Sequence, residues 1–366
     1  MAHIGSRTRS VAFVISSHGF GHASRASAVI EAMRDRDPAL VVELFSHVPR
    51  WYFSQSIGNF NYHRTDCDLG LVQTDSLNAD VGATVIELSK RLPLDPKKVK
   101  ALATQFQALK CQLVISDIAP LGLVAARVAG IPSVLVENFT WDWIYAGLAE
   151  RTPGLRYYSE LLAPLFTHAD LRIQTTPVCV PVSHARTTRP VARRQRQDRA
   201  TTRGKLGLGR GRKLVFISMG GTAQDFSFHQ RLCSDFRGID FVVAGIGTSA
   251  ETHANVTFLP ARTAMYHPDL IHAADIVIGK VGYSTIAEVF EAGVPFGYFV
   301  REHYPEMAPL VTFLRGQVPG LDFEAAEYVG GQWLDRLPQL LAMERLDRPD
   351  VIGGATECAS LISSLF

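Results

Sequence analysis

The sequence predicts an α/β protein with two Rossmann-like domains, each built on a parallel sheet. A length of 366 residues suits two domains, and 47% hydrophobic against 20% charged residues is ordinary for a globular chain. Short β-branched apolar segments alternate with segments of helical spacing, and this alternation restarts after a basic stretch. We therefore predict domains at residues 1–190 and 213–350, a basic linker with a short helix at 191–212, and a C-terminal helix at 351–366.

The first half opens with a strand, a glycine turn, a helix and a second strand, which is the order of a βαβ unit. These elements are expected at residues 11–15, 16–22, 23–34 and 40–45. Further strands are expected at 112–116, 133–137 and 171–175, and helices at 96–109, 120–130 and 161–166.

Two histidines occupy the glycine turn after the first strand. The glycines Gly19 and Gly21 allow the loop to approach a phosphate or a sugar closely. An imidazole can accept a proton near neutral pH, and the dipole at the start of the next helix favours the neutral form of His22 that a base needs. The residues alone favour a simpler interpretation, in which His18 and His22 only hydrogen-bond within the turn.

Other polar residues follow later strands of the first half. Asp117 ends one strand, and Asn138 and Asp142 follow the next. Because ligands of open parallel sheets gather at the carboxyl ends of strands, we expect these residues to share one edge with His18 and His22. Asp117 and Asp142 are alternatively helix caps.

The second half repeats the pattern. Strands are expected at residues 213–219, 240–244, 256–259, 275–279 and 296–300, and a terminal helix at 355–365. A second glycine-hydroxyl turn, Gly220-Gly221-Thr222, follows the first of these strands and can meet a diphosphate. The last strand leads into a loop at 301–306 that is dense in hydrogen-bonding groups, including Arg301 and His303, where a bound sugar would lie.

The stretch from 274 to 295 carries the most chemistry. It is predicted as a strand, a turn at 280–283 and a helix that starts at Ser284-Thr285. Free N–H groups and hydroxyls at a helix start can bind phosphate, and Glu288, one turn on, can accept both hydroxyls of a ribose diol. Gly282 would let the backbone approach the ligand. The alternative is an ordinary N-cap followed by an acidic residue that favours the helix dipole.

Composition excludes other classes of function. A net charge of +2 is too small to indicate nucleic acid, and the five cysteines lack the spacing of a metal or redox site. No apolar run approaches the roughly 18 residues of a membrane span, and no signal-peptide pattern is present, so we expect a cytoplasmic protein. The basic linker is best explained as solvated; attraction to lipid headgroups, giving peripheral membrane contact, is the alternative. The acidic residues of 61–91 have no metal-ligand spacing, and we expect no metal.

The assembled pattern resembles the GT-B glycosyltransferases, which have two facing Rossmann-like domains and an interdomain cleft. At family level it looks like the N-acetylglucosaminyltransferase of peptidoglycan synthesis, through the turns at 19–22 and 220–222 and the spacing from Gly282 to Glu288. It resembles more closely the glycosyltransferase-like N-terminal domain of plant L-arabinokinase. That resemblance rests on residues 18–25, 68–75, 116–117, 136–145, 279–283 and 300–301. No sugar-kinase motif follows, and we expect the kinase half to be absent.

The resemblance implies inverting, metal-independent transfer from a nucleotide-diphosphate sugar, with a UDP-sugar as the expected donor, a hydroxyl of unknown identity as acceptor, and no cofactor. The transferred group would be a hexosyl or N-acetylhexosaminyl unit. The expected base is His22, with Asp117 second. The residues expected on the acceptor side are His18, Asn138 and Asp142. The residues expected to bind the donor are Gly19, Gly21, Gly220, Gly221, Thr222, Lys280, Gly282, Tyr283, Ser284, Thr285, Glu288, Arg301 and His303.

Two other functions stay open on the same residues. One is a nucleotide-sugar epimerase or hydrolase, and the other is a non-catalytic module that binds a nucleotide sugar. A dehydrogenase is disfavoured, because the fingerprint Gly19-x-Gly21-x-x-Ser24 lacks its third glycine. The sequence leaves the oligomeric state undetermined.

Overall fold

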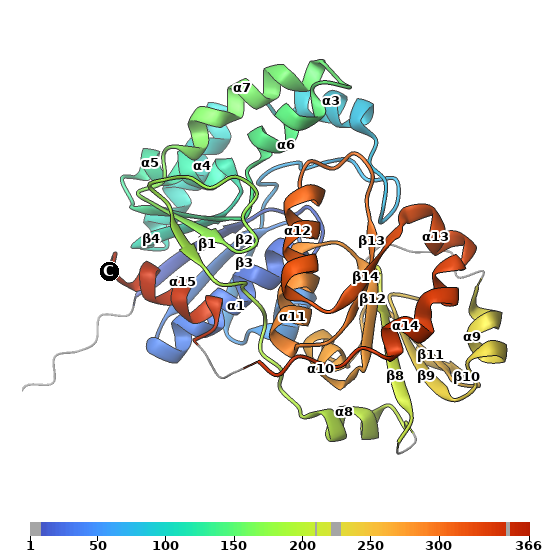
Figure 1. Ribbon diagram of the computed structural model, residues 1–366. Helices are drawn as coiled ribbons and strands as arrows, with labels where there is room; N and C mark the ends of the chain where they lie inside the picture. Colours follow the sequence, from blue (N-terminus) through green and yellow to red (C-terminus); the bar gives the residue numbers. More distant parts are fainter. Residues whose placement is uncertain (1–8, 209–210, 221–227, 349–351) are drawn as a thin grey trace, which may run out of the picture. The chain divides into compact units, whose positions relative to one another are not determined.

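The chain forms two compact units, which are described separately (Figure 1). The structure, a computed structural model, describes residues 9–208, 211–220, 228–348 and 352–366. Unit 1 comprises Met1–Val72, Val81–Val191 and Ile352–Phe366, and unit 2 comprises Gln73–Asp80 and Ala192–Val351. Each unit contains a seven-stranded sheet with helices on it, which confirms the predicted α/β fold class.

The sheet of unit 1 has the strand order β3-β2-β1-β4-β5-β6-β7, and all neighbouring strands are parallel. This is the order of a Rossmann fold extended by one strand, and its switch point lies between β1 and β4. The strands are β1 (Ser10–Ile15), β2 (Val41–Ser46), β3 (Phe60–Arg64), β4 (Leu113–Asp117), β5 (Ser133–Glu137), β6 (Leu171–Thr175) and β7 (Arg186–Thr188).

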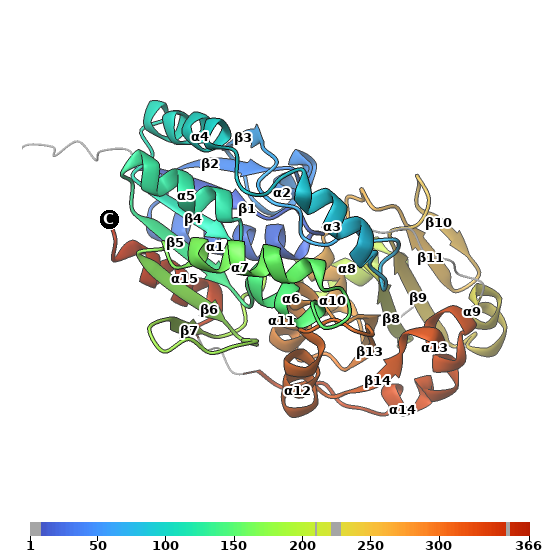
Figure 2. The same cartoon turned by 90° about the horizontal axis from the view of Figure 1, so that it is seen from above.

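Helices cover both faces of this sheet because successive β1 side chains point to opposite faces. Val11 and Phe13 pack in the cluster with α1 and α15, whereas Ala12 and Val14 pack in the cluster with α4 and α5 (Figure 2). The helices are α1 (Gly21–Arg36), α2 (Arg50–Ser56), α3 (Val81–Ser89), α4 (Pro96–Ala108), α5 (Pro120–Ala129), α6 (Trp141–Leu148), α7 (Gly154–Phe166) and α15 (Gly354–Ser363).

The sheet of unit 2 has the order β10-β11-β9-β8-β12-β13-β14, and only the β10–β11 pair is antiparallel. Its strands are β8 (Lys213–Ser218), β9 (Ile239–Ala244), β10 (Glu251–His253), β11 (Val256–Leu259), β12 (Ile276–Lys280), β13 (Phe296–Val300) and β14 (Gly320–Glu324). Its helices are α8 (Arg199–Lys205), α9 (His229–Asp235), α10 (His267–Ala273), α11 (Tyr283–Ala292), α12 (Met307–Gln317), α13 (Ala325–Gly330), the 3-10 helix η1 (Gln332–Arg336) and α14 (Leu337–Leu341).

Strands β8 and β12 of unit 2 approach each other closely at their carboxyl ends, where the polar residues of this unit lie. A Cβ added to Gly279 of β12 would lie 2.5 Å from the backbone oxygen of Ser218, the last residue of β8. Only glycine fits there, so the ends of β8 and β12 are held against each other. Among the described residues, no helix is long and apolar enough to cross a bilayer.

Candidate active site

His22 and Asp117 meet at the carboxyl edge of the unit 1 sheet. The loop after β1 leads into α1, which places His22 in the first turn of that helix. Asp117 is the last residue of β4 and pairs in register with Ile15, the last residue of β1. His22 Nδ1 lies 2.8 Å from Asp117 Oδ1, and both side chains are buried. The two residues predicted for catalysis therefore form a direct hydrogen-bonded pair.

Arg25 is a third member of this cluster. It lies one turn after His22 and binds both carboxylate oxygens of Asp117, with Nε 2.8 Å from Oδ2 and Nη2 2.6 Å from Oδ1. Burial raises the pKa of Asp117, but the charge and hydrogen bonds of Arg25 and His22 outweigh burial and hold that pKa below its usual value. Asp117 is therefore an ionised acceptor. His22 Nδ1 must then carry the proton, which leaves on Nε2 the lone pair that a general base requires.

The other residues predicted for the acceptor side have separate roles. His18 packs edge-on against Trp141, with ring centroids 5.1 Å apart, and its Nδ1 accepts from the backbone N–H of Leu71 at 3.3 Å. Asp142 lies in the first turn of α6, where a carboxylate favours the helix dipole. Both residues thus lie in segments that follow strand ends of the unit 1 sheet.

Asn138 holds a neighbouring loop. Its side-chain amide donates to the backbone oxygens of Thr175 and Pro177, the second at 3.2 Å. Its backbone oxygen accepts from the N–H of Cys179 at 2.9 Å. Asn138 therefore fixes the loop after β6 at the same edge of the sheet.

Glu288 is the centre of a second cluster, in unit 2. Its Oε1 accepts from Arg193 Nε at 2.8 Å, and its Oε2 lies 2.9 Å from His267 Nδ1. Only 2% of the Glu288 side chain is exposed, against 28% of the His267 side chain. Burial raises the pKa of Glu288, but Arg193 and His267 outweigh it and lower that pKa to about 2. Glu288 is thus a carboxylate whose two oxygens already have protein partners.

His267 continues this cluster to a hydroxyl at the end of β8. Its Nε2 lies 3.0 Å from Ser218 Oγ, and its ring packs edge-on against Phe216 at 5.2 Å between centroids. Hydrogen bonds therefore connect Ser218, at the end of β8, through His267 of α10 to Glu288 of α11.

Lys280, at the end of β12, lies against the start of that turn. Gly220 has a φ of +82°, and a Cβ added to it would come within 3.1 Å of Lys280 Cε. Burial and, after it, the positive charge of Arg301 lower the pKa of Lys280 to about 7, against the opposing effects of the acids Asp75 and Glu306. An ammonium beside this turn is suited to a phosphate, and it loses its charge near neutral pH.

The segment Gln73–Asp80 supplies the present partner of Lys280. Lys280 Nζ donates to the backbone oxygen of Ser76 at 3.0 Å. The segment is a tight turn in which the N–H of Thr74 donates to the oxygen of Asn78, and Leu77 packs in the core of unit 2. A peptide carbonyl therefore receives the hydrogen bond that an anionic ligand could accept.

The start of α11 carries residues predicted to bind phosphate. Gly282 is its N-cap residue, and among the described residues no side chain caps the helix and a Cβ added to Gly282 would meet nothing within 4 Å. Tyr283, Ser284 and Thr285 are only partly buried in the first turn. The predicted residues Gly221 and Thr222 lie outside the described residues.

The loop after β13 is organised around Arg301. Its Nη2 donates to Glu306 Oε1 at 2.8 Å, and its guanidinium stacks over the Tyr304 ring at 4.0 Å. His303 is exposed and has a φ of +64°. In unit 1, Gly19 also has a positive φ, +70°, and Gly21 is the first residue of α1.

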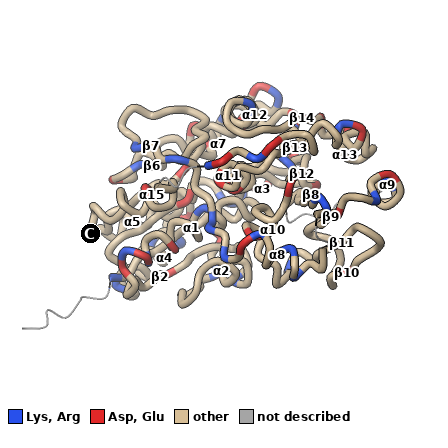
Figure 3. Tube along the Cα trace, turned by 60° about the horizontal axis from the view of Figure 1, so that its bottom comes forward, with Lys and Arg blue, Asp and Glu red and all other residues tan. Residues whose placement is uncertain are grey.

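The arginines of the basic linker have internal partners. Arg193 pairs with Glu288, and Arg199 and Arg203 both pair with Asp275, at 2.6 and 3.2 Å. Figure 3 shows basic and acidic residues interspersed along the trace. These side chains therefore fasten the linker to unit 2.

The comparisons with known proteins decide the family. A family model described as "Glycosyl transferase family 1" matches residues 10–297, which is most of the chain. The match includes the clusters around Asp117 and Glu288 and ends before the loop that follows β13. The chain belongs to glycosyl transferase family 1.

This family 1 member has relatives among characterised and solved proteins. It is 27% identical over 351 residues to L-arabinokinase of Arabidopsis thaliana, covering 94% of this chain and 33% of that protein. The chain therefore spans about a third of the length of that relative. Its fold matches a UDP-glucosyltransferase from Polygonum tinctorium with a TM-score of 0.61 at 13% identity, covering 98% of each chain. It matches MurG of Acinetobacter baumannii with a TM-score of 0.55 at 15% identity, covering 98% of this chain and 100% of that one. These findings confirm both predicted resemblances and the GT-B fold.

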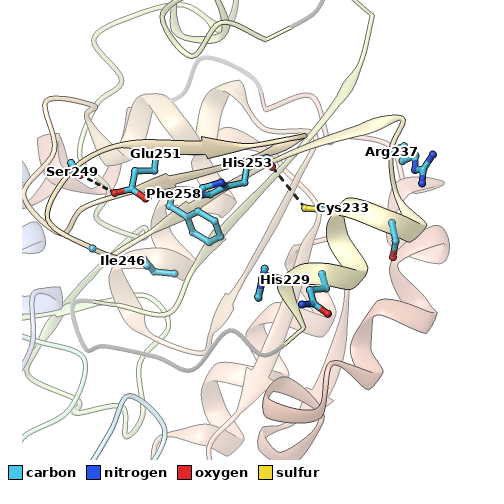
Figure 4. Close-up of a pocket in the computed structure, with 11 residues that line it drawn as sticks. His229, Cys233, Arg237, Ile246, Ser249, Glu251, His253 and Phe258 are labelled. Carbon is cyan, nitrogen blue, oxygen red and sulfur yellow. Dashed lines mark hydrogen bonds and ion pairs between the residues drawn. The ribbon is translucent and has the colours of Figure 1, made fainter.

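A separate cavity of the family 1 chain lies in unit 2 between α9 and the β10–β11 hairpin (Figure 4). It has a volume of about 770 Å³ and is lined by His229, Cys233 and Phe258 among others. Cys233 Sγ donates to the backbone oxygen of His253 at 3.8 Å. None of the predicted site residues that the structure describes lines this cavity. Among the described residues, no three His, Cys, Asp or Glu side chains are grouped so as to hold a metal ion.

Sequence reasoning missed four side chains that the family 1 fold brings to the two clusters. They are Arg25, Arg193, Ser218 and His267. Arg25 follows His22 by three positions on a helix, so helical spacing alone places it on the same face. The other three come from separate elements, and no local pattern connects them to Glu288.

Proposed function

We propose that this protein is an inverting glycosyltransferase that moves a hexosyl or N-acetylhexosaminyl unit from a nucleotide-diphosphate sugar, most simply a UDP-sugar, to an acceptor hydroxyl. The observation that carries the proposal is the His22–Asp117 pair at the carboxyl edge of a Rossmann-type sheet in a chain of glycosyl transferase family 1.

The unit 1 cluster supports the role of the base. Nε2 of His22 takes the proton of the acceptor hydroxyl while the acceptor oxygen forms a bond to the anomeric carbon. The bond from that carbon to the diphosphate oxygen breaks, and the nucleoside diphosphate leaves with the electron pair. Attack from the face opposite the leaving group inverts the anomeric centre. Asp117 holds the tautomer of His22 and stabilises the imidazolium that forms.

The unit 2 cluster supports the binding of the donor. A carboxylate has about four acceptor positions, so Glu288 retains two for a ribose diol after it binds Arg193 and His267. Lys280, Gly220 and the uncapped start of α11 would meet the diphosphate and stabilise its developing charge without a metal ion. Gly221, Thr222, Arg301 and His303 are kept as further donor contacts.

Features outside these clusters remain predictions. His18, Asn138 and Asp142 surround the proposed acceptor position, and the acceptor itself is not identified by them. Peripheral membrane contact through the linker would have to use arginines other than Arg193, Arg199 and Arg203, because those three are paired with acids. Residence in the cytoplasm is retained as an expectation.

The test is donor consumption by the purified chain. UDP-glucose, UDP-N-acetylglucosamine and dTDP-glucose are incubated with and without a panel of hydroxyl acceptors, and products are resolved by mass spectrometry. We expect a glycosylated acceptor and free nucleoside diphosphate, with the anomeric configuration inverted by NMR, and almost no turnover of donor alone.

The other outcomes identify the competing functions. Equal consumption without acceptor indicates a hydrolase, and conversion of the sugar within the intact donor indicates an epimerase. Calorimetric binding of a donor with no turnover across the panel indicates a non-catalytic module. Any of the three contradicts the transferase.

A further inference from the structure

The hydrogen-bonded series Ser218–His267–Glu288 can change its donor and acceptor pattern when His267 gains a proton, and the donor contacts proposed above do not use this change. Glu288 is ionised and can only accept hydrogen bonds, so His267 Nδ1 must donate to it in either protonation state. The state of His267 therefore determines only what happens at Nε2, the nitrogen that lies 3.0 Å from Ser218 Oγ.

The two states of His267 give the serine opposite roles. When the imidazole is neutral, Nε2 has a lone pair and the Ser218 hydroxyl donates its single hydrogen to it. The hydroxyl can then offer a ligand only lone pairs, which repel an anion. When the imidazole is protonated, Nε2–H donates to Ser218 Oγ, and the hydroxyl hydrogen is free to point at a ligand oxygen.

We propose that His267 is a positioning residue that couples binding of the donor diphosphate to uptake of one proton. When His267 is protonated, the Ser218 hydroxyl donates its hydrogen to the phosphate. The proposal rests on the donor site assigned above. The ligand group is a pyrophosphate, which keeps its negative charges throughout the neutral range.

The position of the hydroxyl fits this role. Ser218 ends β8, two residues before Gly220, and Gly279 holds the end of β12 against its backbone. His267 is 28% exposed, whereas Glu288 and Arg193 are almost fully buried, so His267 is the most accessible of these three side chains.

The charges around His267 come from three elements. Glu288 of α11 binds it directly, and Arg193 of the linker balances that carboxylate. On α10 itself, Asp269 accepts from the backbone N–H groups of Arg196 and Gln197. A bound pyrophosphate would add negative charge beside this set and favour the imidazolium, and histidine is the side chain that changes charge near neutral pH. Linkage then requires that the protonated form binds the diphosphate more tightly.

Another histidine on α10 provides a matched control. Burial and the positive charge of Arg345 lower the pKa of His272 to about 4, against opposing effects of Glu288 and Asp269. His272 therefore stays neutral throughout the neutral range, and its replacement should not alter proton exchange.

The test is isothermal titration calorimetry of the full chain with UDP-glucose, and with dTDP-glucose as second probe, in buffers of different ionisation enthalpy at about pH 7.5. Both probes carry a pyrophosphate that does not titrate there, and uridine serves as a probe without phosphate. We expect equal proton uptake by the wild type and His272→Gln with either nucleotide sugar, and none with uridine.

The variants locate the proton. His267→Gln keeps a donor and an acceptor but cannot be protonated, so proton uptake should fall below that of the wild type and affinity should fall less steeply with rising pH. The uptake that remains belongs to Lys280 and should vanish in the double variant His267→Gln/Lys280→Met. Ser218→Ala should weaken both probes by roughly tenfold, the value of one hydrogen bond to a charged group, and leave uridine unchanged. If one of the two variants fails to fold, the wild type and the other variant still show whether His267 and Ser218 couple proton uptake to donor binding.

Two results overturn the inference and can be told apart. Binding of a nucleotide sugar with no proton uptake, or uptake that is equal in His267→Gln and the wild type and disappears in Lys280→Met, contradicts the role of His267 and leaves the transferase standing. Failure of both nucleotide sugars to bind at millimolar concentration removes the donor site itself, and the inference with it.

Discussion

Each unit holds a buried carboxylate between an arginine and a histidine, but the two clusters leave different atoms available. Arg25 donates hydrogen bonds to both oxygens of Asp117, and His22 Nδ1 binds one of the same oxygens. The other ring nitrogen of His22, Nε2, therefore keeps a lone pair. Arg193 and His267 divide the oxygens of Glu288 between them, and the second nitrogen of His267 already faces Ser218. The same residue types therefore give a base in one unit and a polar relay in the other.

The largest effect is expected from Asp117→Asn. The asparagine amide can present an N–H to His22 and favour the tautomer that lacks a lone pair on Nε2, so kcat should fall by about 10²–10⁴. Rates with the best acceptor of the panel, together with the donor dissociation constant, measure this. A kcat within twofold of the wild type would remove Asp117 from the mechanism.

Glu288→Ala is expected to affect stability more than any exposed site. It removes the buried carboxylate that both Arg193 and His267 bind, which costs about 3–5 kcal/mol. Urea denaturation at pH 7 measures the loss, and Glu302→Ala, at an exposed residue, is the control that should stay within about 0.5 kcal/mol. Equal stability of the two variants would show that the Glu288 cluster is not stabilising. Because Glu288→Ala is less stable, its nucleotide affinity has to be compared with that of the wild type at a temperature where the variant is folded.

The same carboxylate predicts how stability depends on acid. The pKa of Glu288 is lowered from 4.5 to about 2 in the folded chain, so the unfolded chain binds more protons between these values. The stabilisation is fully present above about pH 4.5 and is lost as the pH falls toward 2. Urea midpoints from pH 6 to pH 2.5 should decline less steeply in Glu288→Gln than in the wild type, and parallel declines would contradict the assignment.

Removal of Arg25 tests what distinguishes the unit 1 cluster. In Arg25→Met the buried carboxylate of Asp117 loses both hydrogen bonds to the guanidinium, so the folded chain should be destabilised by about 3–5 kcal/mol. Urea denaturation at pH 7 measures this loss. An unchanged urea midpoint would show that Arg25 does not stabilise the ionised Asp117.

The smallest effect is expected at Lys280, whose pKa of about 7 means that it is charged below pH 7 and neutral above. Lys280→Met should weaken donor binding by roughly tenfold at pH 6 and hardly at all at pH 9. Titrations at the two pH values measure this, with His267→Gln as background to remove the second titrating group. A pH-independent loss would contradict the charge of Lys280 as the binding feature.

The sequence predicted the strands well because buried parallel strands are short, apolar and β-branched. The predicted strands at 133–137, 256–259 and 296–300 coincide with β5, β11 and β13. It missed β3, whose sequence Phe60–Arg64 alternates polar and aromatic residues, and β14, where Gly320 and two acids weaken the apolar pattern. The edges of both sheets were therefore less predictable than their centres.

The site was predictable where its residues are close in the chain or end neighbouring strands. His22 and Asp117 follow from the rule about strand ends, and Glu288 follows from helical spacing. The partners of Glu288 come from the linker and from α10, and the partner of Lys280 comes from the segment Gln73–Asp80. Contacts of that kind depend on tertiary packing, which no local pattern in the sequence encodes.

The most direct test of the account is a comparison of His22→Ala with the wild type for turnover and for donor affinity. The account predicts that kcat falls by about 10²–10⁴ while the dissociation constant of the nucleotide sugar is unchanged, because His22 acts on the acceptor hydroxyl in the transition state. Weakened donor binding with an unchanged kcat would contradict the role of His22 as the base.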